Sequence, residues 1–143
     1  MDRHPVSLLN QLRTLRNRRY FSCRFKEFQN ETKRKLFVDD EPLQVLSGPF
    51  EGMLYLDEIV WGSITPKWLG SYEAELHPIL SRIITHEYKQ VIDIGCAEGY
   101  YAIGLAKFMP ITTVYAFDTD FISRRQALRL ARLNGVEKRL KIG

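Results

Sequence analysis

The stretch VIDIGCAEGYYAIGLA, from Val91 to Ala106, decides the fold because it passes from an apolar strand through a glycine turn into an apolar helix. We expect the strand to end at Gly95 and the helix to begin near Gly99, since glycine adopts positive φ and brings no side chain into the turn. The first N–H groups of such a helix have no partner within it and carry partial positive charge. The turn is therefore predicted to hold a polar ligand against exposed backbone.

The rest of the C-terminal part alternates between strand and helix patterns around this turn. Strand, helix, strand, helix and strand in succession are typical of parallel βαβ winding, in which the crossovers are right-handed. The sequence therefore predicts an α/β fold with a parallel sheet, preceded by a helical N-terminal extension. The predicted elements are strands at 90–94, 112–117 and 139–142 and helices at 100–108 and 122–133.

Two kinds of cofactor use such a turn, and its residues favour one of them. A dinucleotide site has the pattern G-x-G-x-x-G, but this chain has Ala97 and Tyr100 where the second and third glycines would stand, and Tyr100 would crowd a pyrophosphate. Asp93 and Glu98 are expected to make the rim of the pocket negative, which favours a cationic sulfonium ligand over phosphate groups. A nicotinamide-dependent dehydrogenase is the less favoured alternative.

A second acidic position follows the next predicted strand. In the stretch VYAFDTD, Asp118 stands 23 residues after Gly95. An acid at this point of the topology accepts hydrogen bonds from the ribose hydroxyls of a nucleoside, and Phe117 or Phe121 would then border the base. The alternative for Asp118 is a helix N-cap, which is also the role expected for Asp120.

These motifs resemble those of class I S-adenosylmethionine-dependent methyltransferases. DIGCAEG is similar to the acid-x-Gly-x-Gly-x-Gly loop of that family, and VYAFDTD followed by ARLNGV resembles its second strand and second helix. The stretch GYYAIGLA is closest to FkbM-type members, and the resemblance covers residues 48–143. It implies S-adenosylmethionine as the cofactor and transfer of a methyl group to an oxygen or nitrogen of an acceptor. The cofactor-binding residues that it implies are Asp93, Gly95, Cys96, Ala97, Gly99 and Asp118.

The resemblance also implies a role for individual residues. Asp93 would orient the loop and help to bind the methionine moiety, Gly95 and Gly99 would give the cofactor room, and Asp118 would hold the ribose. Ala97 departs from the family pattern, because the middle glycine of the loop is replaced. No catalytic residue and no metal ligand is indicated. Methyl transfer needs little acid–base equipment, since the sulfonium is a strong leaving group and the protein aligns the nucleophile.

The chain departs from the family in length as well. A class I methyltransferase sheet has seven strands in the order 3-2-1-4-5-7-6, whereas this chain of 143 residues ends near the third. The resemblance therefore implies a Rossmann-like methyltransferase fold with an incomplete parallel sheet and a helical N-terminal extension. The first strand is then expected to form an exposed apolar edge, which is a site for pairing with another chain. We expect a truncated reading frame, a fragment, or a chain completed by a partner or a second copy. A non-catalytic fragment or interaction module that keeps part of the fold is the alternative function.

The N-terminal residues differ in charge from the rest. Residues 1–35 carry ten Lys or Arg and three acids, within a chain of net charge +4. Apolar residues recur among them at helical spacing, which predicts one or two amphipathic helices. Their basic face is either simply solvated or a surface for phosphate, nucleic acid included. A small-molecule or glycan acceptor is nevertheless favoured by the resemblance. The predicted division is 1–47 as this extension, 48–88 as a pre-domain segment and 89–143 as the cofactor-binding half-domain.

The pre-domain segment is rich in glycine and aromatic residues. Met53–Leu56 and Glu58–Trp61 are expected to form short β-like pieces. Trp68, Tyr72 and Glu73 are placed to fold over the mouth of the cofactor site. The alternative for Trp68 and Tyr72 is packing into the helical layer.

Cysteine and apolar content indicate the compartment. Cys23 and Cys96 are too few for a disulfide framework and lack metal-site spacing, so reduced thiols in a cytoplasmic protein are expected. No apolar run approaches the length of a membrane span.

Overall fold

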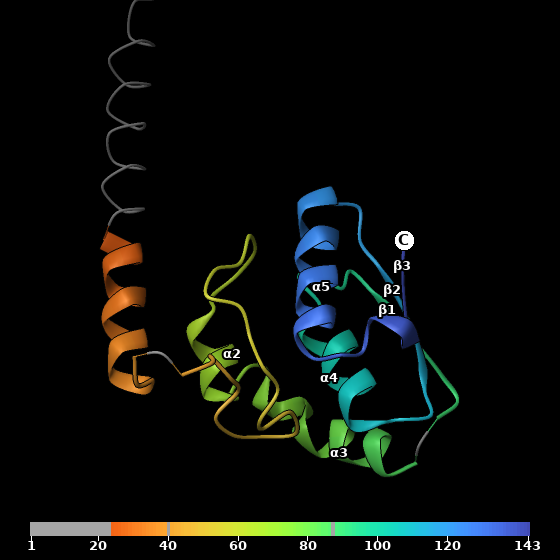
Figure 1. The fold of residues 1–143 in the computed structure, drawn as a ribbon. Helices are drawn as coiled ribbons and strands as arrows, with labels where there is room; N and C mark the ends of the chain where they lie inside the picture. The colour runs from red at the N-terminus through yellow and green to blue at the C-terminus, as the bar shows by residue number, and fades with distance from the viewer. Residues whose placement is uncertain (1–23, 40, 87) are drawn as a thin grey trace, which may run out of the picture. The chain divides into compact units, whose positions relative to one another are not determined.

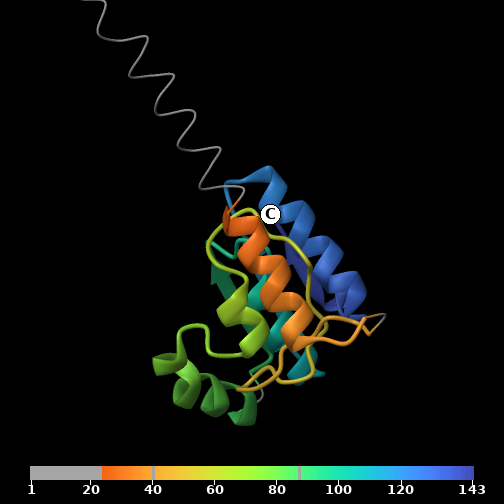
Figure 2. The same cartoon turned by 90° about the vertical axis from the view of Figure 1, so that its left-hand side faces the viewer.

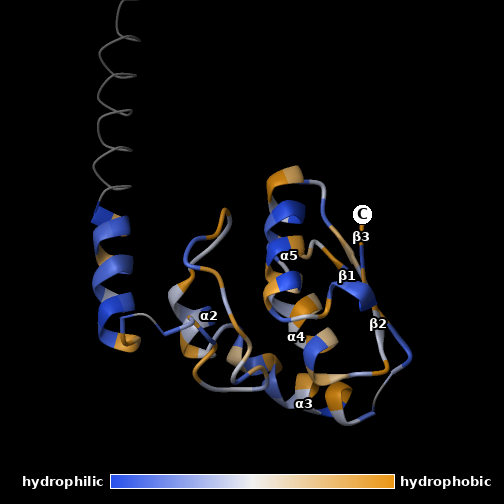
Figure 3. Ribbon diagram, viewed as in Figure 1, coloured by the Kyte–Doolittle hydropathy of each residue, from blue (hydrophilic) through white to orange (hydrophobic). Residues whose placement is uncertain are grey.

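The structure is a computed structural model that describes residues 24–39, 41–86 and 88–143. The chain divides into two compact units, Met1–Asp40 and Glu41–Gly143. In the first unit a helix covers residues 24–36, and its surface is mainly hydrophilic (Figure 3). Cys23 and the predicted helical pattern before it lie outside the described residues. The predicted boundaries at residues 47 and 88 stay predictions.

A three-stranded parallel sheet forms the centre of the second unit. Its strands are β1 (Gln90–Ile94), β2 (Thr113–Phe117) and β3 (Leu140–Ile142), in the order β1-β2-β3. The carboxyl ends of the first two strands are level, because Ile94 pairs with Phe117. The predicted α/β fold with an incomplete parallel sheet is confirmed, and the strand ends differ from the prediction by at most one residue.

Two helices connect these strands and lie on the same face of the sheet (Figure 1). The first, α4 (Tyr100–Phe108), is almost wholly apolar, because the sheet, the second helix and the upstream loop all pack against it. The second, α5 (Phe121–Leu133), is amphipathic, and its turns alternate between hydrophobic and hydrophilic residues in Figure 3. Its start at Phe121 is one residue earlier than predicted.

The described residues of this unit leave the other face of the sheet open. Ile92 is 66% exposed and Ile94 is 84% exposed, and the two flank Asp93 in β1. Among residues 24–39, 41–86 and 88–143, no strand pairs with the free edge of β1. The exposed apolar edge that the sequence predicts is therefore present, and it adjoins an uncovered apolar face.

The upstream part of this unit packs against α4 and α5 and leads into the sheet. In the described part of this unit, three helices precede β1, namely α2 (Thr65–Leu69), η1 (Ala74–Leu76) and α3 (His77–His86). Before them, the chain forms an isolated antiparallel bridge between Gln44 and Leu54. Residues 58–61 form no strand, so the prediction of a β-like piece there is wrong. Within the ranges that the structure describes, no helix has the length and apolarity needed to cross a membrane.

Candidate functional site

The turn after β1 has a left-handed backbone at alternate positions. The φ angles are +80° at Gly95, +47° at Ala97 and +93° at Gly99. The backbone N–H groups of Gly95 and Cys96 both donate to the carbonyl oxygen of Phe117, at 2.8 and 3.0 Å. The turn is therefore fixed to the carboxyl end of β2, which is the edge where open α/β sheets bind ligands.

The two glycines of this turn serve different purposes. A Cβ built on Gly95 has no atom within 4 Å, so the backbone there faces open space. A Cβ on Gly99 would lie 2.1 Å from Cδ1 of Ile103 and 3.3 Å from Cβ of Ala127. Gly99 therefore allows α4 and α5 to approach closely, whereas Gly95 leaves a cradle that a ligand could fill.

Asp118 lies across from the turn and is held there by two backbone groups. Its Oδ2 accepts the N–H of Ala97 at 2.8 Å, and its Oδ1 accepts the N–H of Asp120 at 2.8 Å. The helix N-cap is Asp120, which accepts the N–H of Ile122 at 2.8 Å as predicted. Asp118 is thus not the cap of α5, and its half-buried carboxylate keeps free lone pairs for further donors.

Asp93 has a carboxylate that is only partly satisfied. Its Oδ2 is buried and has no hydrogen-bond partner. Burial raises the pKa of Asp93, a backbone N–H from Ala102 opposes that shift, and the charge of Asp118 adds to it. A buried carboxylate oxygen without a partner costs free energy, and a cationic group placed beside it would remove that cost.

Glu98 does not shape the rim of the turn, contrary to the prediction. Only 1% of its surface is exposed. Its Oε1 forms an ion pair with Nζ of Lys67 and accepts the hydroxyl of Tyr55. Lys67 and Tyr55 come from the pre-domain segment, so this cluster joins that segment to the turn. No local pattern predicts this pairing, since both partners lie more than 30 residues from Glu98.

Two further side chains of the turn point into the protein. Tyr100 is 3% exposed and packs edge-on against Phe50, with ring centroids 5.4 Å apart. The prediction that Tyr100 would crowd a pyrophosphate therefore fails. Cys96 is buried, and burial followed by the neighbouring carboxylates raises the pKa of its thiol to about 12. The thiol stays protonated at neutral pH and is no nucleophile.

The aromatic residues before the first strand pack inside the upstream segment. Trp68 is 1% exposed, and its indole N–H donates to the carbonyl oxygen of Leu56 at 3.0 Å. Tyr72 packs edge-on against Tyr100, with ring centroids 5.4 Å apart. These contacts support the packing alternative for Trp68 and Tyr72 rather than a place over the cofactor site.

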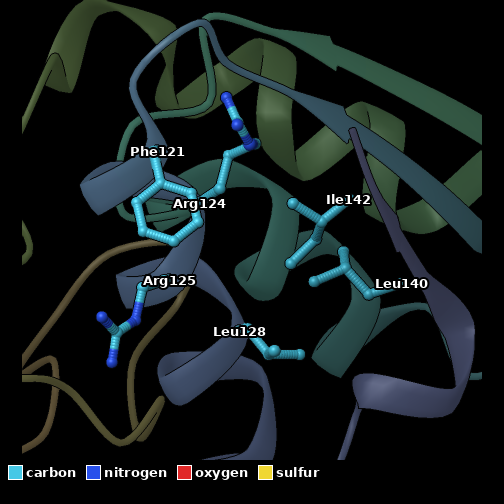
Figure 4. Close-up of a pocket in the computed structure, with 6 residues that line it drawn as sticks. All are labelled: Phe121, Arg124, Arg125, Leu128, Leu140 and Ile142. Atoms are coloured by element: carbon cyan, nitrogen blue, oxygen red, sulfur yellow. The ribbon is translucent and has the colours of Figure 1, made fainter.

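A hollow of about 370 Å³ lies between α5 and β3, and Phe121, which was expected to border the base, is one of the residues that line it. In Figure 4, Leu128 from the helix and Leu140 and Ile142 from the strand point into the space between the two elements. The residues that line it include Arg124 and Arg125 but no carboxylate, so a sulfonium ion would find no counter-charge there. In the part of the chain that the structure describes, no three His, Cys, Asp or Glu side chains gather as a metal site would require.

No protein-family model matches the chain, and no curated protein matches it. Two solved structures are similar to it in part. A protein from Klebsiella pneumoniae proposed to be an O-methyltransferase is 24% identical, with a TM-score of 0.40, over 46% of this chain and 29% of that one. Coclaurine N-methyltransferase bound to N-methylheliamine and SAH is 14% identical, with a TM-score of 0.47, over 98% of this chain and 44% of that one. The chain thus spans less than half the length of either structure.

Proposed function

We propose that residues 89–143 form the cofactor-binding part of an S-adenosylmethionine-dependent methyltransferase. The observation that carries the proposal is the placement of Asp118 against the turn, where its carboxylate meets the N–H of Ala97 at 2.8 Å. A carboxylate fixed beside an open glycine turn fits a ligand that has both a vicinal diol and a polar tail. Asp93, on the neighbouring strand, supplies a second carboxylate to the same edge.

The residues fit this cofactor on three counts. Gly95 offers backbone without a side chain, which leaves room for the ligand. Asp93 presents a buried oxygen without a partner, which suits the ammonium group of a methionine moiety. Asp118 suits the ribose hydroxyls. Two carboxylates at the site disfavour the pyrophosphate of a dinucleotide, even though neither Glu98 nor Tyr100 contributes to that exclusion.

In the proposed mechanism these residues bind and orient the cofactor, and they transfer no proton. S-adenosylmethionine, when bound, supplies a methyl group on a sulfonium that is a good leaving group. Ala97 and Asp120 hold the Asp118 carboxylate in one orientation before the ligand arrives, which lowers the entropic cost of binding. Asp93 contributes negative charge near the site of the cation. None of the candidate site residues on the described chain is placed as a general base.

The test is a calorimetric titration of the purified chain with S-adenosylhomocysteine. We expect binding by the wild type and a loss of at least tenfold in affinity for Asp118→Ala, since charge-assisted hydrogen bonds contribute about 1.5–3 kcal/mol. Thermal melting of both proteins checks that the variant is folded. The absence of wild-type binding would reject the proposal, and so would equal affinities of the two proteins.

A second function is favoured by one observation, the open face of the sheet. Ile92 and Ile94 are exposed there beside the free edge of β1. A non-catalytic module that uses this face to bind another polypeptide is therefore the alternative. The same titration separates the two, because a module without a cofactor pocket would not bind S-adenosylhomocysteine.

The finer parts of the proposal concern the methyl acceptor and the cellular compartment. We propose an oxygen or nitrogen acceptor on a small molecule or glycan, in line with the FkbM-like stretch GYYAIGLA. The basic residues before position 36 leave a nucleic-acid acceptor as the second choice. The free thiol of Cys96 fits a reducing compartment such as the cytoplasm.

A further inference from the structure

The segment 54–61 runs along α5 in the opposite direction and is fastened to it at successive positions. Figures 1 and 2 show this segment beside the helix. Its first contact is near the C-terminal end of α5 and its last is at the N-terminal cap, so it ends at the edge of the sheet where Asp118 lies. The contacts join Leu54 to Asn134 at 3.0 and 2.9 Å, Asp57 to Arg129 at 3.8 Å, Val60 to Gln126 at 3.2 Å, and Trp61 to Asp120 at 2.7 Å.

Trp61 stands at the end of this segment, and its indole nitrogen is hydrogen-bonded to the cap of α5. Its indole N–H donates to Oδ2 of Asp120 at 2.7 Å, while 61% of the residue is exposed to solvent. The other tryptophan, Trp68, is 1% exposed and packs in the core. A large aromatic ring that is exposed yet fixed in direction has its apolar face free for a ligand.

Hydrogen bonds connect Trp61 to the candidate nucleoside site. Asp120 accepts the indole N–H with its carboxylate, and its own backbone N–H donates to Oδ1 of Asp118 at 2.8 Å. The indole is therefore two hydrogen bonds away from the carboxylate that is proposed to hold the ribose. The base of a nucleoside is bonded to the ribose carbon next to the two hydroxyl groups. A ribose held at Asp118 therefore places its base one sugar ring away from that carboxylate.

We propose that Trp61 covers the purine base of the nucleoside bound at Asp118, an inference that rests on the proposed function. Base–aromatic stacking is strong enough to change affinity about tenfold per base. The segment 54–61 has no regular secondary structure. Its role is then to carry an aromatic side chain from the pre-domain segment to the edge of the sheet where Asp118 lies. Asp120 orients this side chain while it also caps α5.

The experiment titrates the full chain with S-adenosylhomocysteine and, separately, with S-ribosylhomocysteine, which lacks the base. Trp61→Ala should bind S-adenosylhomocysteine about tenfold more weakly than the wild type and S-ribosylhomocysteine equally well. Trp61→Phe keeps an aromatic face and should retain most of the affinity. Val60→Ala, on the same segment, is the matched control, because its backbone bond to Gln126 does not need the side chain.

Tryptophan fluorescence gives a second readout. Binding of S-adenosylhomocysteine should change the emission of the wild type, whereas Trp61→Phe, which keeps only the buried Trp68, should show no change. Equal affinity of wild type and Trp61→Ala for S-adenosylhomocysteine would overturn this inference and leave the proposed function standing. An equal loss for both ligands would also overturn it, since Trp61 would then be structural. Lack of any wild-type binding would reject the proposed function itself.

Discussion

The carboxylate of Asp118 and the backbone N–H of Ala97 are joined by a hydrogen bond of 2.8 Å, although 21 residues separate them. This bond connects the ends of β1 and β2 and orients the carboxylate toward the glycine turn. Ala97 makes it with φ at +47°, a conformation that costs a non-glycine residue about 1–2 kcal/mol. Such strain persists only where the surrounding structure holds it, as the hydrogen bonds of Asp118 do here.

Gly95→Ala tests whether the open space at the turn is used. Gly95 and Gly52 have the same φ of +80°, and a Cβ on either meets no atom within 4 Å. Alanine at either position should lower the free energy of unfolding by about 1–2 kcal/mol, because both residues are left-handed. Only Gly95→Ala should weaken binding of S-adenosylhomocysteine, measured by calorimetry. Unchanged binding by Gly95→Ala, or an equal loss in Gly52→Ala, would show that the cradle is not occupied by the ligand.

Asp93→Asn should make the folded chain more stable and should weaken its binding of the cofactor. The pKa of Asp93 is raised in the folded chain, chiefly by burial. A raised pKa contributes stability that is fully present below the ordinary value of 3.8 and is lost as the pH rises through the folded-state value. Asparagine has no proton to lose, so the melting temperature of the variant should exceed that of the wild type at pH 7.

The control for Asp93→Asn is the pH dependence of that difference. The gain in stability should shrink as the pH falls through the folded-state pKa of Asp93. It should vanish below about 3.8, where Asp93 is protonated in both the folded and the unfolded wild type. Calorimetry at pH 7 should show about tenfold weaker binding of S-adenosylhomocysteine, since an ammonium would lose its charged partner. A variant that is less stable at pH 7 and binds as tightly as the wild type would contradict the role given to Asp93.

Lys67→Met tests the buried pair between the pre-domain segment and the turn. Lys67 and Glu98 have side chains that are 5% and 1% exposed, so removal of the cation leaves a buried carboxylate. The free energy of unfolding, measured with urea, should fall by about 3–5 kcal/mol. The double variant Lys67→Met with Glu98→Gln should recover most of that loss, because no unpaired charge remains.

The exposed pair of Lys35 and Glu31 supplies the comparison for Lys67. Its side chains are 72% and 63% exposed, so Lys35→Met should cost at most about 0.5 kcal/mol. A loss for Lys67→Met as small as this would mean that water reaches Glu98 and that the pre-domain segment is not fastened to the turn as described.

Local patterns in the sequence predicted the elements that carry the turn. β1 and α4 fall where apolar runs meet Gly95 and Gly99, and the N-cap at Asp120 follows from residue type. These features depend on neighbours in the chain, so a single sequence contains the information.

Features that depend on distant partners escaped prediction. Glu98 was predicted to lie at the rim because its cationic partner, Lys67, stands 31 residues earlier in the chain, in helix α2. The stretch around Trp61 has a β-like composition, but its hydrogen bonds go to side chains of α5 rather than to a strand. Side-chain pairing across such distances leaves no periodicity in the sequence, and therefore only the structure revealed the position of Trp61.

The most direct test of the central claim is a nuclear magnetic resonance titration of the ¹⁵N-labelled chain with S-adenosylhomocysteine. The account predicts that the largest amide shifts fall at residues 95–99 and 118–120, together with the indole N–H of Trp61. Shifts confined to the residues around the hollow between α5 and β3, or to the open face of the sheet at Ile92 and Ile94, would contradict it. The complete absence of shifts at ligand concentrations in the millimolar range would contradict it as well.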